Sequence, residues 1–315
     1  MSTKVIIDCD PGQDDAVALF LAFASPELDV LGVTTVGGNV PLELTHRNAR
    51  MMCDIAGAGD VPVFAGCDRP MQRPLRTAEY IHGETGIDGI DIFEPVTPLQ
   101  EQHGVEFIIE TLLSADDDSL TLVPTGPLTN IGTAINREPA ILPKIRRIVL
   151  MGGAMREGGN RTPSAEFNIL VDPEAADAVF RCGRPITQMG LDVTHRVLST
   201  KPRVDRIRSL DNPVARATAG MIGFFERYDM SKYSAPGAPL HDPCTVAWLI
   251  RPELFKGKDC NVAIETQSEL TLGHTAVDFW RVTDRPRNVH WIFDVDSDGF
   301  YDLLTERLAR YGAPQ

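Results

Sequence analysis

Short apolar runs alternate with longer amphipathic stretches along the first two thirds of the chain. The apolar runs predict strands at residues 5–7, 30–36, 61–64, 120–123, 147–151 and 186–189. The amphipathic stretches predict helices at residues 16–24, 42–55, 105–114, 128–135 and 173–181. Strands that alternate with helices are typical of α/β proteins, so we expect an open, mostly parallel sheet flanked by helices.

The last third of the chain departs from this alternation. Residues 261–293 indicate short strands in a small C-terminal antiparallel appendage, and residues 298–310 predict an amphipathic helix. The polar, Gly-rich stretch 83–98 predicts a surface loop near the functional site. Because no internal repeat or low-complexity linker interrupts the chain, we expect one domain over residues 1–315.

Four aspartates crowd the end of the first predicted strand and the start of the next helix. Asp8 and Asp10 come at the strand end, and Asp14 and Asp15 follow a Pro-Gly turn. Helix capping explains Asp14 and Asp15 but not the other two. Carboxylates this close repel one another unless a positive charge lies among them, and a hard divalent cation is the natural partner for carboxylate oxygens.

Small residues follow the other predicted strands. They occur at 37–39, 124–127, 152–153 and 190–192. In open α/β sheets ligands bind at the carboxyl ends of the strands, where small residues let a ligand approach the backbone. We therefore expect these turns to share one pocket with the aspartates.

Composition narrows the class of protein. The chain has 315 residues, 43% of them hydrophobic, and a formal net charge of −14. Such a charge argues against a nucleic-acid partner, and the lack of a long apolar run argues against a membrane span. The six cysteines are scattered, as expected of reduced core thiols. Because the chain goes straight into a predicted strand, we expect no signal peptide. We expect a cytoplasmic protein.

Two further segments carry candidate groups. His241 and Asp242 precede a helical pattern, where Asp242 is either an N-cap or an oxygen ligand and His241 is a candidate proton donor. A Gly-rich loop at 158–168 offers groups that can bind sugar hydroxyls, but these residues taken alone favour a solvated loop. These groups are Asn160, Glu166 and Asn168.

Four ordered motifs resemble the inosine/uridine-preferring nucleoside hydrolases. The first is the run Asp8-Cys9-Asp10-Pro11-Gly12-Gln13-Asp14-Asp15-Ala16. The others are residues 123–130, residues 165–168 followed by 172–176, and residues 241–244. The resemblance extends from about residue 4 to 310 and so covers nearly the whole chain.

The resemblance implies a bound Ca²⁺ and a role for each matching residue. Carboxylates of Asp10, Asp15 and Asp242 and the backbone carbonyl of Thr125 would hold the metal. Five side chains would bind the ribose hydroxyls: Asp14, Asn39, Asn160, Glu166 and Asn168. His241 would protonate the leaving base. His82 is a further catalytic candidate, because it falls where some pyrimidine-preferring members place a second histidine near the base. Independently of the resemblance, we expect residues 224–239, with Tyr228 and Tyr233, to form the wall around the base, because aromatic side chains can stack on it.

The implied activity is hydrolysis of the N-glycosidic bond of a ribonucleoside, with Asp10 taking the proton of the attacking water. It implies a role in nucleoside salvage and a homo-oligomer, a dimer or tetramer. The choice between purines and pyrimidines stays open, with His82 favouring pyrimidines or a broad range. Two alternatives compete: a haloacid-dehalogenase-like phosphatase that uses Asp8 as nucleophile, and a calcium-dependent riboside-binding protein without catalysis.

Overall fold

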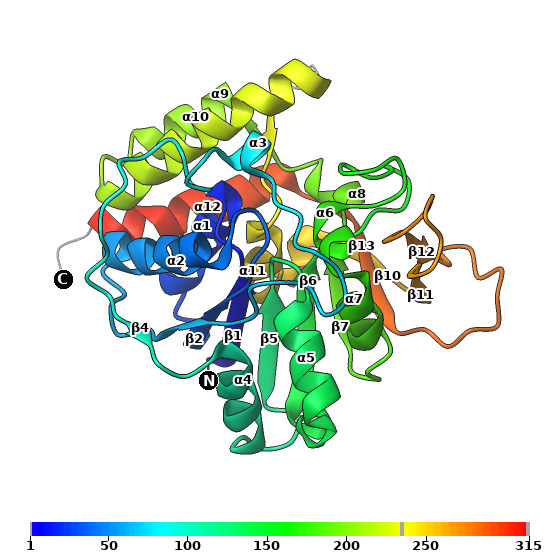
Figure 1. Ribbon diagram of the computed structural model, residues 1–315. Helices are drawn as coiled ribbons and strands as arrows, with labels where there is room; N and C mark the ends of the chain where they lie inside the picture. The colour runs from blue at the N-terminus through cyan, green and yellow to red at the C-terminus, as the bar shows by residue number, and fades with distance from the viewer. Residues whose placement is uncertain (1, 234–235, 313–315) are drawn as a thin grey trace.

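The fold is built on one large sheet, in the order β10-β13-β7-β6-β5-β1-β2-β3-β4 (Figure 1). The structure is a computed structural model that describes residues 2–233 and 236–312, and the side chains of 225–233 lie outside the description. The strands are β1 (Thr3–Cys9), β2 (Leu28–Thr35), β3 (Val63–Ala65), β4 (Leu99–Gln100), β5 (Leu120–Pro124), β6 (Ile145–Met151), β7 (Ile186–Met189), β10 (Phe255–Cys260) and β13 (Val289–Val295). Neighbouring strands pair in parallel except at the edge strand β10, which confirms the mostly parallel sheet.

Helices cover both faces of the sheet (Figure 1). They are α1 (Gln13–Phe23), α2 (Leu42–Ala56), α3 (Glu79–His82), α4 (Gly104–Leu113), α5 (Thr129–Arg137), α6 (Phe167–Val171), α7 (Pro173–Phe180), α8 (Leu191–Thr194), α9 (Lys201–Arg208), α10 (Pro213–Tyr233), α11 (Pro243–Ile250) and α12 (Ser297–Ala309). Strand β1 shows how the faces are divided, because successive side chains point to opposite sides of a sheet. Val5 and Ile7 pack with α1, α2, α11 and α12, whereas Ile6 packs with α4, α5 and α7.

Two small antiparallel pairs accompany the large sheet. They are β8 (Leu198–Thr200) with β9 (Gly237–Pro239), and β11 (Val262–Ile264) with β12 (Thr275–Val277). The second pair confirms the predicted C-terminal appendage. Its predicted extent was wrong, because β13 inserts beside β7 in the large sheet.

Helices α9 and α10 had no counterpart in the sequence prediction. The apolar positions of α10 include small residues such as Ala215, Ala219 and Gly220, so the chain offers only a weak helical stripe there. Ala215 and Ala219 are nevertheless buried in the core. Packing against the core therefore stabilises α10, although its local sequence pattern predicts a helix only weakly.

The cysteines are free thiols, as expected from their scattered positions. All six cysteines are unpaired, and Cys9, Cys53, Cys244 and Cys260 are buried. Within residues 2–233 and 236–312, no helix is long and apolar enough to span a bilayer.

Candidate active site

A hollow of about 530 Å³ opens at the carboxyl ends of the central strands. The lining side chains from the sequence prediction are Asp14, Asn39, His82, Thr125, Asn160, Glu166, Asn168, His241 and Asp242. Segments that are far apart in sequence thus meet at one place, as expected for the switch region of an α/β sheet. Asp10 and Asp15 are buried and bonded to lining residues, whereas the side chains of Tyr228 and Tyr233 lie outside the described residues.

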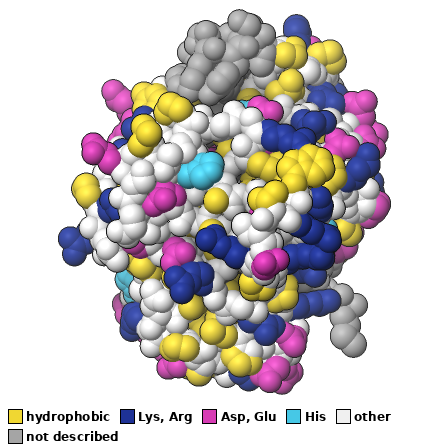
Figure 2. Space-filling view, turned by 90° about the vertical axis from the view of Figure 1, so that its right-hand side faces the viewer, with side chains coloured by type: hydrophobic (Ala, Val, Ile, Leu, Met, Phe, Trp, Pro, Cys, Tyr) yellow, Lys and Arg dark blue, Asp and Glu magenta, His cyan; other side chains and the backbone are white. Residues whose placement is uncertain are grey.

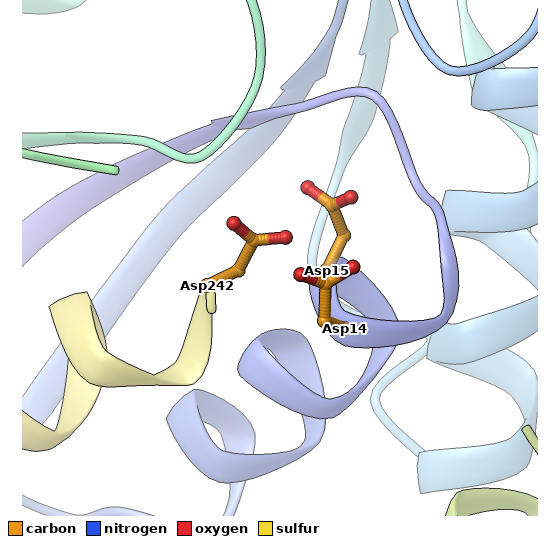
Figure 3. Close-up of side chains that lie close together, drawn as sticks. All are labelled: Asp14, Asp15 and Asp242. Carbon is orange, nitrogen blue, oxygen red and sulfur yellow. The ribbon is translucent and has the colours of Figure 1, made fainter. Parts of the chain in front are cut away.

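Three carboxylates converge at the base of this hollow. Asp14 and Asp15 stand in the first turn of α1, and Asp242 points toward them from the start of α11 (Figure 3). One oxygen from each lies within 4.8 Å of the others. Burial and Asp15 raise the pKa of Asp14 to about 7, and burial with Asp14 raises the pKa of Asp242 well above its usual value. This accumulation of buried negative charge fits a metal ion.

Asp10 lies next to this cluster and contributes an unsatisfied oxygen. Its Oδ2 accepts the backbone N–H of Asn39 at 2.7 Å, whereas its Oδ1 is buried without a hydrogen-bond partner in the described part of the chain. A Cβ atom at Gly38 or Gly126 would collide with this carboxylate, so only glycine permits such an approach. A buried carboxylate oxygen without a partner is costly, and a cation would satisfy it.

Thr125 links the acidic cluster to the opposite wall of the hollow. Its hydroxyl donates to Oδ1 of Asp15 at 2.7 Å, and its carbonyl accepts the side-chain amide of Asn168 at 2.6 Å. The carbonyl keeps a second lone pair. Carboxylates together with this carbonyl make an all-oxygen donor set, which suits Ca²⁺ or Mg²⁺ better than a softer metal.

The loop at 158–168 is buried only where it meets the hollow: Glu166 and Asn168 are buried, whereas Asn160 is half-buried and Arg161 is exposed. The solvated-loop interpretation therefore does not hold for Glu166 and Asn168. Glu166 is 2% exposed and caps α6, with Oε1 accepting the N–H of Asn168 at 2.9 Å and Oε2 that of Gly153 at 2.8 Å. Asn160 accepts the N–H of Phe167 at 3.0 Å. These bonds fix the polar groups in place, as binding of a polyhydroxylated ligand requires.

His82 is held by a residue that the sequence prediction did not single out. Gln13 donates its amide nitrogen to the carbonyls of His82 and Asp88 at 2.9 and 3.2 Å. Its amide oxygen therefore faces Nδ1 of His82, at 2.7 Å, and Nδ1 must carry the proton. Burial lowers the pKa of His82 to about 4, so the ring is neutral at physiological pH.

His241 has a comparable support. Its Nδ1 lies 2.7 Å from Oγ1 of Thr194, and the ring of His195 lies 5.7 Å from its own. Burial, with His195 and His82 nearby, lowers the pKa of His241 well below its usual value. Thr194 was also missed by sequence reasoning, because no motif marks a partner 47 residues away in the chain.

The mouth of the hollow is bridged by two residues that the sequence prediction left aside. Arg161 donates to the hydroxyl of Tyr80 at 3.0 Å, and its guanidinium lies 5.0 Å from the centre of that ring. Tyr80 comes from α3 and Arg161 from the 158–168 loop, so the pair joins opposite walls.

Asp8 lies apart from the hollow. Its side chain is fully buried, and its Oδ1 accepts Thr34 and Asn130 at 2.5 and 2.7 Å. A carboxylate enclosed in this way cannot attack a phosphoester in the hollow. The phosphatase alternative with Asp8 as nucleophile is therefore wrong.

Known proteins resemble this chain over its whole length. Residues 5–302 match the family described as inosine-uridine preferring nucleoside hydrolase. The pyrimidine-specific ribonucleoside hydrolase RihA of Photobacterium profundum is 51% identical over 312 residues, which cover 99% of this chain and 100% of that protein.

Solved structures agree with this assignment. The purine-preferring ribonucleoside hydrolase from Gardnerella vaginalis superimposes with a TM-score of 0.91 at 33% identity, over 98% of this chain and 99% of that one. A plant nucleoside hydrolase, PpNRh1, gives 0.92 at 32% identity over the full length of both chains. The chain therefore belongs to the inosine-uridine preferring nucleoside hydrolase family.

Proposed function

We propose that this protein hydrolyses the N-glycosidic bond of ribonucleosides and releases ribose and free base. The observation that carries the proposal is the buried Oδ1 of Asp10, which has no hydrogen-bond partner among the described residues and lies beside the cluster of Asp14, Asp15 and Asp242. The hollow above them also contains amide groups suited to sugar hydroxyls and a histidine. A non-catalytic riboside binder would have no need of that histidine.

The metal in this proposal is Ca²⁺. Carboxylates of Asp10, Asp15 and Asp242 and the carbonyl of Thr125 would hold it, because Ca²⁺ prefers hard oxygen donors such as these. When bound, the cation supplies a positive charge that favours loss of a proton from a water or hydroxyl beside it.

Asp10 would act as the base that takes the proton of the attacking water. Its buried carboxylate has a raised pKa, because of burial and then Asp15, which gives it the basicity that this step needs. Asp14, Asn39, Asn160, Glu166 and Asn168 would bind the ribose hydroxyls. Their oxygens would also stabilise the positive charge of an oxocarbenium-like transition state in a site organised beforehand.

His241 would deliver a proton to the departing base, with Thr194 fixing the orientation of the ring. Because burial and the neighbouring histidines lower its pKa, a proton taken up by the ring would be passed on readily to the base. His82 would have a different role. Because Gln13 holds the proton on Nδ1 and the ring stays neutral, His82 is suited to accept a hydrogen bond at Nε2 and position the base. Tyr228 and Tyr233 are proposed to stack on the base.

Pyrimidine ribonucleosides are the preferred substrates in this proposal. This preference is supported by sequence identity: the chain is 51% and 49% identical to two proteins named pyrimidine-specific, but 33% identical to one named purine-preferring.

A homo-oligomer is also proposed, because large hydrophobic side chains are exposed to solvent where a second copy of the chain could cover them. Trp280 and Val282 are 73% and 84% exposed. Figure 2 shows the face on which their loop lies, with hydrophobic side chains gathered among Lys and Arg.

Chromatography of free base from uridine, cytidine, inosine and adenosine tests the proposal. We expect the wild-type protein to release base fastest from uridine or cytidine. Asp10→Asn should release no base from any ribonucleoside that the wild type cleaves. A 2′-deoxyribonucleoside should be cleaved far more slowly, because it leaves buried polar partners unpaired. Release from none of the four by the wild-type protein would contradict the proposal.

A further inference from the structure

Asp8 is the one aspartate of the N-terminal cluster that the proposed mechanism does not use. By strand alternation its side chain points to the same face as Ile6, toward α5 and away from α1. It is fully buried, and no side chain among the described residues provides it with a cationic partner. Such a costly group calls for an explanation.

Asp8 holds a short turn at both of its ends. Its backbone carbonyl accepts the N–H of Thr125 at 2.8 Å, where the turn leaves β5. Its carboxylate accepts the side-chain amide of Asn130 at 2.7 Å, where the turn enters α5. One residue therefore fixes the start and the end of the segment 125–130.

Asn130 is itself immobilised on three other segments. Its Nδ2 also donates to the carbonyl of Thr35 at 3.0 Å, and its Oδ1 accepts the N–H of Cys67 at 2.8 Å. A Cβ atom at Gly66 would collide with this amide, so the packing leaves Asn130 little freedom. These contacts, together with the bond to Asp8, fix the position of the turn relative to the ends of β1, β2 and β3.

This turn carries groups that face the acidic cluster. The Thr125 hydroxyl donates to Asp15 at 2.7 Å, and a Cβ atom at Gly126 would collide with Asp10. We infer that Asp8 and Asn130 are positioning residues, which hold the turn so that the Thr125 carbonyl lies at the right place for a cation. The inference rests on the proposed metal site.

Asn130→Ala is the most direct test, because it breaks the clamp without changing the charge near the metal. Outer-shell residues typically contribute 10- to 100-fold to metal affinity, so we expect calorimetric titration of metal-stripped protein with Ca²⁺ to show a loss of roughly this size. Asn288→Ala is the matched control. Its amide also makes three bonds, to Phe180 and Val262 at 2.8 to 2.9 Å, but lies at the other end of the sheet.

Both variants should unfold at a lower temperature than the wild type. When binding is measured on the folded proteins, only Asn130→Ala should bind Ca²⁺ more weakly than the wild type. Asn130→Ser provides a milder variant if Asn130→Ala does not fold. Unchanged Ca²⁺ affinity in a folded Asn130 variant would overturn the inference and leave the proposed metal site intact. Absence of Ca²⁺ binding to the wild type would overturn the metal site and the inference with it.

Discussion

The Nδ1 atom of His82 lies 2.7 Å from the amide oxygen of Gln13, and this contact determines which ring nitrogen carries the proton. The amide nitrogen of Gln13 is committed to two backbone carbonyls, so the amide cannot be reversed without losing both bonds. The lone pair of His82 is therefore at Nε2. A residue of the first motif thus controls the chemistry of a residue 69 positions later in the chain.

Nitrogen-15 NMR of the histidine rings tests this assignment. We expect His82 of the wild type to be the Nδ1–H tautomer, and Gln13→Leu to give a mixture of tautomers. The variant should also lose roughly 1–3 kcal/mol of unfolding free energy, because the buried hydrogen bonds of the Gln13 amide to the His82 ring and to two backbone carbonyls are lost. A wild-type spectrum with the proton on Nε2 would contradict the assignment.

The lowered pKa of His82 makes stability depend on pH. The unfolded chain protonates this histidine near 6.5, whereas the folded protein does so at about 4, because burial penalises the charged ring. Between these values the unfolded state binds more protons, so stability falls as the pH decreases. His82→Gln should remove this component, worth up to roughly 3 kcal/mol across the window.

Urea unfolding of both proteins between pH 5 and 7 measures the difference. The wild type should lose more stability than His82→Gln as the pH is lowered. Parallel pH profiles for the two proteins would show that His82 is not kept neutral by the fold.

Removal of His241 should separate catalysis from metal binding. We expect His241→Ala to lower kcat for uridine by roughly 10²- to 10⁴-fold, the usual contribution of a positioned acid, while Ca²⁺ affinity stays unchanged. His290→Ala is the control, since His290 pairs with Asp259 at 2.7 Å outside the hollow. A His241 variant with wild-type kcat would remove this residue from the mechanism.

The Arg161–Tyr80 bridge predicts an effect on substrate affinity. Arg161→Met should raise KM roughly fivefold with a smaller change in kcat, because a contact of about 1 kcal/mol across the mouth is lost. Arg156→Met serves as the matched control. Arg156 lies in the same connection after β6, but its guanidinium stacks 4.9 Å from the ring of Phe279. Equal KM values for the two variants would argue against a role for the bridge.

Much of the site was predictable because its signals are local. The run from Asp8 to Asp15 is contiguous, and strand periodicity placed it at the carboxyl end of a strand. The contiguous pair His241-Asp242 was assigned to the site from the family motif, and both segments meet in one hollow. The sequence prediction grouped Asp10 with Asp15 and Asp242 as metal ligands. The structure also draws Asp14 into a cluster with Asp15 and Asp242, a proximity that arises only when α11 packs beside α1.

Residues that act through another residue carry no such signal. Gln13 and Asn130 lie within two of the motifs and Thr194 lies in none, but nothing in the sequence assigns a role to any of them. Their importance comes from partners more than 40 positions away. The burial of Asp8 was equally hidden, because strand alternation gives the face of a side chain but not what covers it. Long-range packing decides these features, and a single sequence does not specify it locally.

In the proposed function, a cation held by buried carboxylates supports cleavage of a ribonucleoside. The most direct measurement is uracil release from uridine by metal-stripped protein, before and after addition of Ca²⁺. We expect no release from the stripped protein and full recovery on addition of Ca²⁺. Undiminished release by protein shown to be free of metal would contradict the account.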